Sequence, residues 1–229
     1  MDPTFWHERW QQHQIGFHQL RVNPLLQTFW HPCIQQNHGT VFVPLCGKSL
    51  DMVWLSQQGH GVLGVEISPI AVKDFFREQG IQPIEDPPRK PFRCFQSQRI
   101  RLLCGDFFDL TPDWVSNVEA VYDRAALVAL PPELQKRYAS KLLEILPHRP
   151  PIFLITLEYD PSEMAGPPFT TPEETVFQLF GEEYWIAPLA TRDVLTDEPG
   201  LQGRGLSRLV EKAYWLHKRD DDHGIKESP

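Results

Sequence analysis

The sequence predicts an α/β fold with a mostly parallel sheet, and three observations support this. Short apolar segments of strand length alternate with amphipathic segments of helix length along the 229-residue chain. The turn after the first strand contains Gly47, and the second strand ends on an acid, Glu66. Their separation of 19 residues matches the spacing at which an acid on the second strand reaches ribose hydroxyls beside a glycine turn. We therefore expect a nucleoside-bearing small molecule at the carboxyl edge of the sheet.

Local signals predict the elements in the first third of the chain. Residues 1–33 form an aromatic-rich helical region, and a β-branched and aromatic run marks a buried strand over about 40–45. Ser49 is a suitable N-cap for a helix through residue 58, which a glycine ends. The second strand covers about 61–66.

The rest of the chain continues the alternation. Ser68 and Pro69 open a helix that Gly80 ends, and four prolines over 81–93 predict an irregular loop. The remaining expected elements are a hairpin over 92–96 and 99–104, strands over about 118–122 and 152–157, helices over 134–146 and 171–180, and two late strands, 185–190 and 206–217, paired at the sheet edge. We expect one domain over 1–229, with a frayed polar tail over 218–229.

The glycine turn indicates which nucleoside is bound. It holds one glycine, whereas a dinucleotide fingerprint uses three so that the backbone can approach a pyrophosphate. A P-loop needs a further glycine five residues before Gly47, where Phe42 stands, so we interpret Lys48 as an exposed lysine at a helix start. S-adenosylmethionine, which carries ribose and adenine without a phosphate chain, fits these constraints.

Seven motifs carry a resemblance to a known family. They are WHERW (6–10), GFHQ (16–19), PLCGKS (44–49), GVEIS (64–68), FFDL (107–110), YDRAALVA (122–129) and GPPF (166–169). In this order, and over nearly the whole chain, they resemble the bacterial branch of the thiopurine S-methyltransferase family. The resemblance implies the Rossmann-like fold of class I S-adenosylmethionine-dependent methyltransferases, with a mostly parallel seven-stranded sheet, helices on both faces, and an N-terminal helical lid over residues 1–35.

Strand ends then supply the expected cofactor contacts. The spacing makes Glu66 the acceptor for the ribose hydroxyls. The resemblance implies that Leu45 lies beside the methionine part. Asp106 and Phe107 follow the third strand, where Asp106 could accept from the adenine amine and Phe107 could cover the ring. The alternative for Asp106 is a turn residue after Gly105.

Arg124 and the lid complete the expected site. An arginine at a strand end suits a carboxylate, and the resemblance implies that Arg124 contacts the cofactor; the alternative is an ion pair with Asp123 or Glu66. In the family the N-terminal segment folds over the cofactor, so Trp10 would shield the sulfonium and Phe17 would wall the acceptor pocket.

The family implies an acceptor pocket formed by the lid, the loop of Pro168 and Phe169, and a late loop over 192–205. Whether Arg192 or Arg204 contacts the acceptor stays open, and no catalytic residue is assigned; His18 and Asp123 are the candidates for a base. We expect methyl transfer to the sulfur of a small aromatic or heterocyclic thiol. The alternatives are an acceptor derived from selenium or tellurium oxyanions, or a non-catalytic protein that binds S-adenosylmethionine.

Composition excludes several other classes. The net charge of −8 argues against a nucleic-acid partner, which usually needs a basic face. No apolar run near 20 residues predicts a membrane span, and the N-terminus lacks the apolar core of a signal peptide. The four cysteines form no CxxC pair and the histidines match no zinc spacing, so we expect no metal and a cytoplasmic location. A monomer is expected.

Overall fold

The computed structural model describes residues 3–34 and 39–219. A single sheet of nine strands runs through these residues in the order β3-β4-β5-β2-β1-β6-β7-β9-β8. The strands are β1 (Thr40–Val43), β2 (Gly61–Glu66), β3 (Ile84–Glu85), β4 (Arg93–Ser97), β5 (Ile100–Cys104), β6 (Val118–Arg124), β7 (Ile152–Glu158), β8 (Tyr184–Asp193) and β9 (Val210–Lys218). The five central strands, β5 to β7 in this order, are parallel, and both edges are antiparallel.

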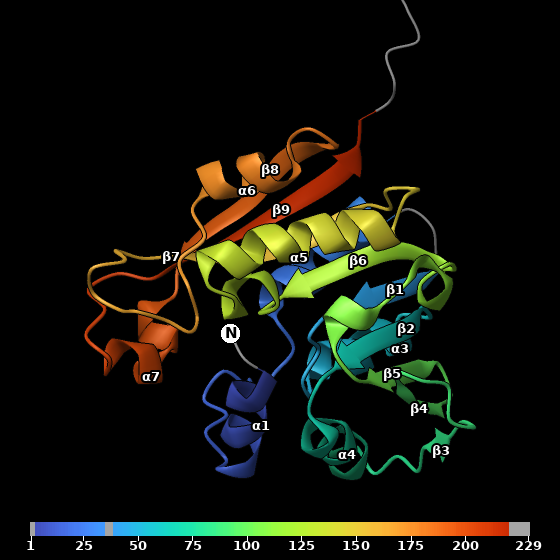
Figure 1. The fold of residues 1–229 in the computed structure, drawn as a ribbon. Coiled ribbons are helices and arrows are strands. Elements are labelled where there is room, and N and C mark those ends of the chain that lie inside the picture. The colour runs from blue at the N-terminus through green and yellow to red at the C-terminus, as the bar shows by residue number, and fades with distance from the viewer. Residues whose placement is uncertain (1–2, 35–38, 220–229) are drawn as a thin grey trace, which may run out of the picture.

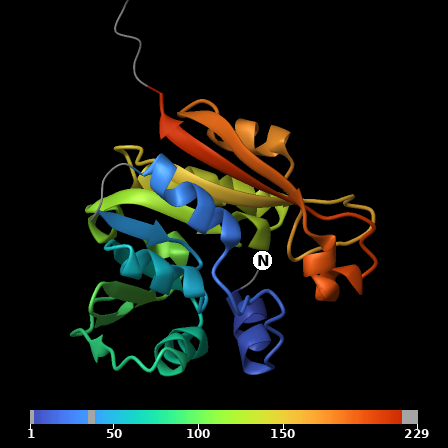
Figure 2. The same cartoon turned by 180° about the vertical axis from the view of Figure 1, so that it is seen from behind.

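Helices cover both faces of this sheet, as predicted. The α-helices of the described residues are α1 (Pro3–Gln11), α2 (Pro24–Cys33), α3 (Leu50–Gln57), α4 (Pro69–Glu78), α5 (Pro132–Ile145), α6 (Glu173–Phe180) and α7 (Pro199–Gln202). Helices α5 and α6 lie in front of the sheet in Figure 1, and α2 and α3 come to the front when the molecule is turned (Figure 2). The fold prediction of a Rossmann-like sheet between helical layers is therefore confirmed.

Alternation along the strands divides the core between the two faces. In β1, the side chain of Phe42 enters the core under α5 and α6, whereas Val41 and Val43 enter the core under α2, α3 and α4. Both cores are closely filled by aromatic side chains, with Tyr138 of α5 on one side and Trp30 of α2 on the other. The sheet is thus buried on both faces, as a parallel sheet requires.

The expected strand count of seven is wrong. The hairpin predicted over 92–104 is present as β4 and β5, and the short β3 pairs with β4 through Ile84 and Glu85. Two residues in the proline-rich segment, which the sequence predicts as a loop, thereby extend the sheet edge. Both are exposed, so no apolar pattern marks them as a strand.

Only part of the expected lid covers the carboxyl edge of the sheet. Helix α1 packs against α4 beyond the sheet (Figure 1). Helix α2 instead lies on the sheet face, with Leu26 and Trp30 fully buried. From residue 220 onward, the expected frayed tail lies outside the described residues. Within the described ranges, no helix combines the length and apolar character needed to cross a bilayer.

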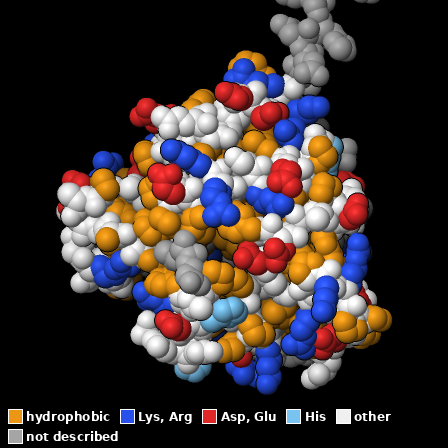
Figure 3. Space-filling model, viewed as in Figure 1, with side chains coloured by type: hydrophobic (Ala, Val, Ile, Leu, Met, Phe, Trp, Pro, Cys, Tyr) orange, Lys and Arg blue, Asp and Glu red, His pale blue; other side chains and the backbone are white. Residues whose placement is uncertain are grey.

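The surface carries mixed charge. On the face in Figure 3, acidic and basic side chains are interspersed with apolar ones. A nucleic-acid backbone is bound by a continuous basic face, and the expectation that this protein has no such partner stays a prediction.

Candidate active site

Two adjoining cavities open at the carboxyl ends of the parallel strands. The small cavity has a volume of about 110 Å³ and the large cavity about 480 Å³. The small cavity lies among the glycine turn, the end of β2 and α1; the large cavity lies among the lid, β7 to β9 and α7. The residues shared by both linings are Trp6, Phe17, Gln19, Arg124, Ala125, Val128 and Pro168. Ligands bound in the two cavities would therefore lie next to each other.

Glu66 closes the glycine turn. Its Oε2 accepts from the Gly47 backbone N–H at 2.9 Å, and its Oε1 accepts from the Ser68 N–H at 2.7 Å. The side chain is 5% exposed. Burial raises the pKa of Glu66 to about 7, although the N–H donors of Ser68 and Gly47 oppose the rise. Each oxygen keeps a second lone pair, so the carboxylate can also accept from hydroxyl groups in the small cavity.

The turn itself has an unusual backbone. Gly47 has a φ of +53° and Leu45, which lines the small cavity, a φ of +45°. Both lie in the left-handed region, which favours glycine. The predicted N-caps of α3 and α4 are confirmed, because the Ser49 side chain accepts from the Asp51 N–H and the Ser68 side chain accepts from the Ala71 N–H.

The interpretation of Lys48 as an exposed lysine is wrong. Its side chain is 8% exposed, and Nζ donates to Glu78 Oε1 at 2.8 Å. This contact lowers the pKa of Glu78 and ties the start of α3 to the end of α4. Helix α4 packs beside the glycine turn, and the sequence around Lys48 gives no sign that Glu78 lies so close.

Arg124 lines both cavities from the end of β6. Its Nη1 lies 3.8 Å from Asp51 Oδ2, so its ion-pair partner is Asp51 rather than Asp123 or Glu66. The contact is too long for a hydrogen bond, and the guanidinium makes no hydrogen bond to another described side chain. Its donors are thus available to a bound carboxylate.

Aromatic side chains of the lid cover the small cavity. The rings of Trp10 and Phe17 meet edge to face with centroids 5.7 Å apart, and Trp6 contacts Phe17 in the same way at 5.6 Å. Trp10 is buried over the glycine turn, where a methyl group on Gly47 would lie 3.5 Å from its Cζ2. Phe17 remains 37% exposed at the junction of the two cavities.

The structure does not bring Asp106 and Phe107 into either cavity. Asp106 caps the 3-10 turn Phe107–Asp109 by accepting from the Phe108 N–H at 2.9 Å. The turn directs the Phe107 ring into the core, between Phe42 and Tyr138. The observed contacts of Asp106 therefore match the alternative interpretation, in which it is a turn residue after Gly105.

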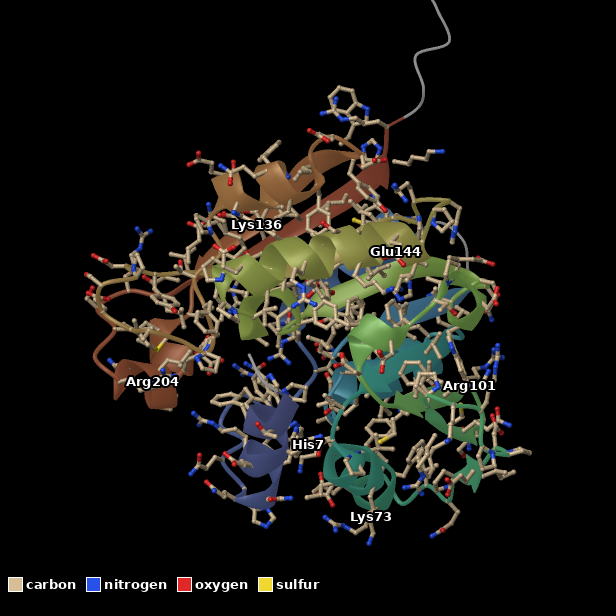
Figure 4. The ribbon with its side chains drawn as sticks, viewed as in Figure 1. His7, Lys73, Arg101, Lys136, Glu144 and Arg204 are labelled. Atoms are coloured by element: carbon tan, nitrogen blue, oxygen red, sulfur yellow. The ribbon has the colours of Figure 1, made fainter. Side chains whose placement is uncertain are left out.

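The loop 166–169 is held in place from two sides. Arg204 donates to the carbonyls of Pro167 at 2.7 Å and Gly166 at 3.3 Å, and Figure 4 shows Arg204 beside α7. The Phe169 N–H donates to the Val128 carbonyl at 2.6 Å. Pro168 lines both cavities, whereas the Phe169 ring packs on Gly166 and lines neither.

Arginines concentrate around the large cavity. Arg192 lines it and lies 3.6 Å from Asp197, and Arg204 also lines it. Arg9, Arg21 and Arg124 also line it. Sequence reasoning missed Arg9 and Arg21, because neither stands at a strand end or in a recognisable turn.

The two base candidates differ in position. His18 lines the small cavity, and its pKa is lowered by burial and by the neighbouring Lys48. Asp123 lines neither cavity; it accepts from the Leu127 N–H at 3.1 Å and the Tyr138 hydroxyl at 2.6 Å. Burial raises the pKa of Asp123 to about 6. Asp123 is engaged in the core and does not face a ligand.

Four acids near the cavities were also missed. Asp197, Glu198 and Glu211 line the large cavity, and Asp51 lies behind Arg124. An acidic residue in the first turn of a helix, such as Asp51, is ordinarily explained by its favourable interaction with the helix dipole, so its presence there does not indicate a binding site. Among the described residues, no group of three or more His, Cys, Asp or Glu side chains could hold a metal ion.

Comparisons with known proteins agree with this architecture. A structure of 1,6-didemethyltoxoflavin-N1-methyltransferase from Burkholderia thailandensis aligns with a TM-score of 0.61 at 14% identity, covering 95% of this chain and 87% of that one. A S-adenosylmethionine-dependent methyltransferase from Anabaena variabilis aligns with a TM-score of 0.64 at 13% identity, covering 95% of each chain. These likenesses concern the fold.

Sequence relatives are much closer. A thiopurine S-methyltransferase of Methylococcus capsulatus is 60% identical over 94% of this chain and 97% of that protein. One of Nitrosospira multiformis is 50% identical over 96% of this chain and 99% of that protein. The family profile described as Thiopurine S-methyltransferase (TPMT) matches residues 1–219. The chain therefore belongs to the thiopurine S-methyltransferase family of S-adenosylmethionine-dependent methyltransferases.

Proposed function

We propose that the protein moves the methyl group of S-adenosylmethionine to the sulfur of a small aromatic or heterocyclic thiol. One observation carries this proposal. The small cavity is lined by a carboxylate, Glu66, and a guanidinium, Arg124, and it opens directly into a larger cavity. The carboxylate suits the ribose of a nucleoside and the guanidinium suits its amino-acid tail, and the adjoining cavity would receive the acceptor.

The residues of the small cavity suit the cofactor. Glu66 would accept from the ribose hydroxyls, and Arg124 would bind the carboxylate of the methionine part. Trp10 would present an indole ring to the sulfonium, and Leu45 would line the wall beside it. The adenine contacts expected of Asp106 and Phe107 stay predictions.

The chain's contribution to the reaction is mainly positional. When bound, S-adenosylmethionine supplies a methyl group activated by its sulfonium. Trp10 and Phe17 would exclude water, and Phe17 and Pro168, at the junction of the cavities, would hold the acceptor sulfur in line with the methyl group. Ideal orientation of two reactants is worth up to about 7–11 kcal/mol. Phe169, whose ring lines neither cavity, stays a predicted substrate contact.

No general base is required when the acceptor thiol is already acidic, because the thiolate is present before it binds. His18 lines the small cavity, and its lowered pKa keeps the imidazole neutral near pH 7. It remains the candidate for removing a proton from a less acidic acceptor. Asp123 is a weaker candidate, because its oxygens accept from Leu127 and Tyr138.

One observation favours a second acceptor class. Five arginines, Arg9, Arg21, Arg124, Arg192 and Arg204, outnumber the three acids that line the large cavity, Asp197, Glu198 and Glu211, and guanidinium groups suit small anions. Acceptors derived from selenium or tellurium oxyanions are therefore the alternative to an organic thiol.

The test begins with calorimetric titration of S-adenosylhomocysteine, followed by methyl transfer to 6-mercaptopurine in the same preparation. Binding with turnover supports the proposal, and inhibition of that turnover by selenite would indicate that both acceptors share the large cavity. Binding without turnover on either acceptor would instead support a binding protein. Absence of binding would refute the proposal.

Variants at both ends of the small cavity sharpen this test. Arg124→Ala and Glu66→Ala should each weaken the binding of S-adenosylhomocysteine by about 1–3 kcal/mol, the cost of losing hydrogen bonds to a charged group. An unchanged affinity in either variant would mean that the cofactor lies elsewhere. The monomeric state and cytoplasmic location stay predictions that size-exclusion chromatography and cell fractionation would check.

A further inference from the structure

A buried carboxylate stands directly behind the proposed cofactor site. Asp51, in the first turn of α3, is 1% exposed and lines neither cavity. Its nearest charged partner is Arg124, whose Nη1 lies 3.8 Å from Oδ2. A carboxylate this deeply buried is costly unless a charge and hydrogen bonds compensate it. The position of Asp51 therefore calls for an explanation.

Two hydrogen bonds fix the Asp51 carboxylate. The Tyr122 hydroxyl donates to Oδ2 at 2.9 Å, and the Asn23 backbone N–H donates to Oδ1 at 2.8 Å. Tyr122 is itself buried in the sheet, and the Asn23 side chain donates to Glu211 at 3.0 Å while capping α2. The carboxylate is thus held from the sheet and from the base of the N-terminal segment.

Arg124 is oriented by charge rather than by hydrogen bonds. The distance to Asp51 allows strong attraction in a buried setting but does not engage a donor. The guanidinium donates to no described residue, and Arg124 lines both cavities, so its N–H groups are available to a ligand there. A ligand carboxylate on the cavity side would then place Arg124 between two negative groups.

We propose that Asp51 is the positioning residue for Arg124, and that the charge and the position of its carboxylate together set the affinity for the amino-acid part of the cofactor. This inference rests on the proposed function, in which Arg124 binds the methionine carboxylate. Asp51 touches neither cofactor nor acceptor; it acts by holding the guanidinium in the orientation that the ligand carboxylate needs.

The experiment compares two ligands in the variant Asp51→Asn, which keeps the shape of the side chain and an oxygen acceptor but removes the charge. S-adenosylhomocysteine has the amino-acid part, whereas 5′-methylthioadenosine has the nucleoside and thioether without it. Calorimetry should give a Kd for S-adenosylhomocysteine raised about tenfold, the scale of a lost charge-assisted contact. The Kd for 5′-methylthioadenosine should stay within about twofold, because this ligand lacks the carboxylate that Arg124 would bind in the proposed site.

Tyr122→Phe is the matched control, because it removes one hydrogen bond to the same Asp51 oxygen and leaves the charge. Its ratio of the two Kd values should remain near that of the natural chain. If Asp51→Asn does not fold, Asp51→Glu keeps the charge but displaces the carboxylate by one methylene, and the same selective weakening is expected. An equal loss of both ligands, or no loss, would overturn the inference. If the natural chain binds neither ligand, the proposed function itself fails.

Discussion

Protonation of Glu66 should control the binding of the nucleoside. Its carboxylate accepts from Gly47 and Ser68, and it would accept from the ribose hydroxyls as well. All of these donors favour the ionised form. With a pKa of about 7, the ionised fraction falls from about 90% at pH 8 to about 10% at pH 6. The affinity of a ligand that requires the carboxylate should fall by a factor of about ten, or 1.4 kcal/mol.

The cysteine and histidine side chains near Glu66 have pKa values that are shifted away from pH 7. Burial raises the pKa of Cys104 to about 11 and that of Cys46 well above its usual value, so both stay thiols from pH 6 to 8. Burial and the neighbouring Lys48 lower the pKa of His18 from its usual value, which moves its titration away from pH 7. Glu66 is therefore the group of the small cavity expected to titrate around pH 7.

Calorimetric titration of 5′-methylthioadenosine at pH 6, 7 and 8 tests the prediction, because this ligand carries no group that titrates there. Repeating the pH 7 titration in two buffers of different ionisation enthalpy should reveal release of about half a proton. The variant Glu66→Gln should bind more weakly at pH 8 and show a flat profile. A constant affinity in the natural chain, or an unchanged slope in Glu66→Gln, would refute the role assigned to Glu66.

Three further outcomes are expected. Because the pKa of Glu66 is raised, its contribution to the free energy of unfolding is present at pH 4.5 and is lost as the pH rises through 7. Urea unfolding of the ligand-free protein should therefore show a free energy of unfolding that decreases by up to about 3 kcal/mol over this range. The variant Glu66→Gln should show a smaller decrease. Gly47→Ala, at a φ of +53°, should lower the free energy of unfolding by about 1 kcal/mol, and a variant as stable as the natural chain would contradict the left-handed turn. Arg204→Ala frees the carbonyls of Pro167 and Gly166, so initial-rate kinetics should give a higher KM for 6-mercaptopurine with an unchanged Kd for S-adenosylhomocysteine; a change in both would mean that Arg204 acts beyond the acceptor loop.

Much of the fold could be predicted because its signals are local. The strand 61–66 was predicted with the bounds that the structure has, and Ser49 and Ser68 cap their helices as expected. Spacing alone brought Gly47 and Glu66 together, since a strand, a turn and a helix of standard length return the chain to the adjacent parallel strand. The strand β3 was missed because two exposed residues carry no periodic pattern.

Local patterns along the chain are sufficient to predict most of the strands and helices and the chemical types at the strand ends, including Glu66 and Arg124. The partner that each side chain meets depends on how these elements pack. Lys48 is buried against Glu78, Phe107 turns into the core, and Asp51 comes to lie behind Arg124. The physical reason is that hydrophobic periodicity and capping act within a few residues, whereas an ion pair or a buried ring depends on segments far apart in the chain that only packing brings together.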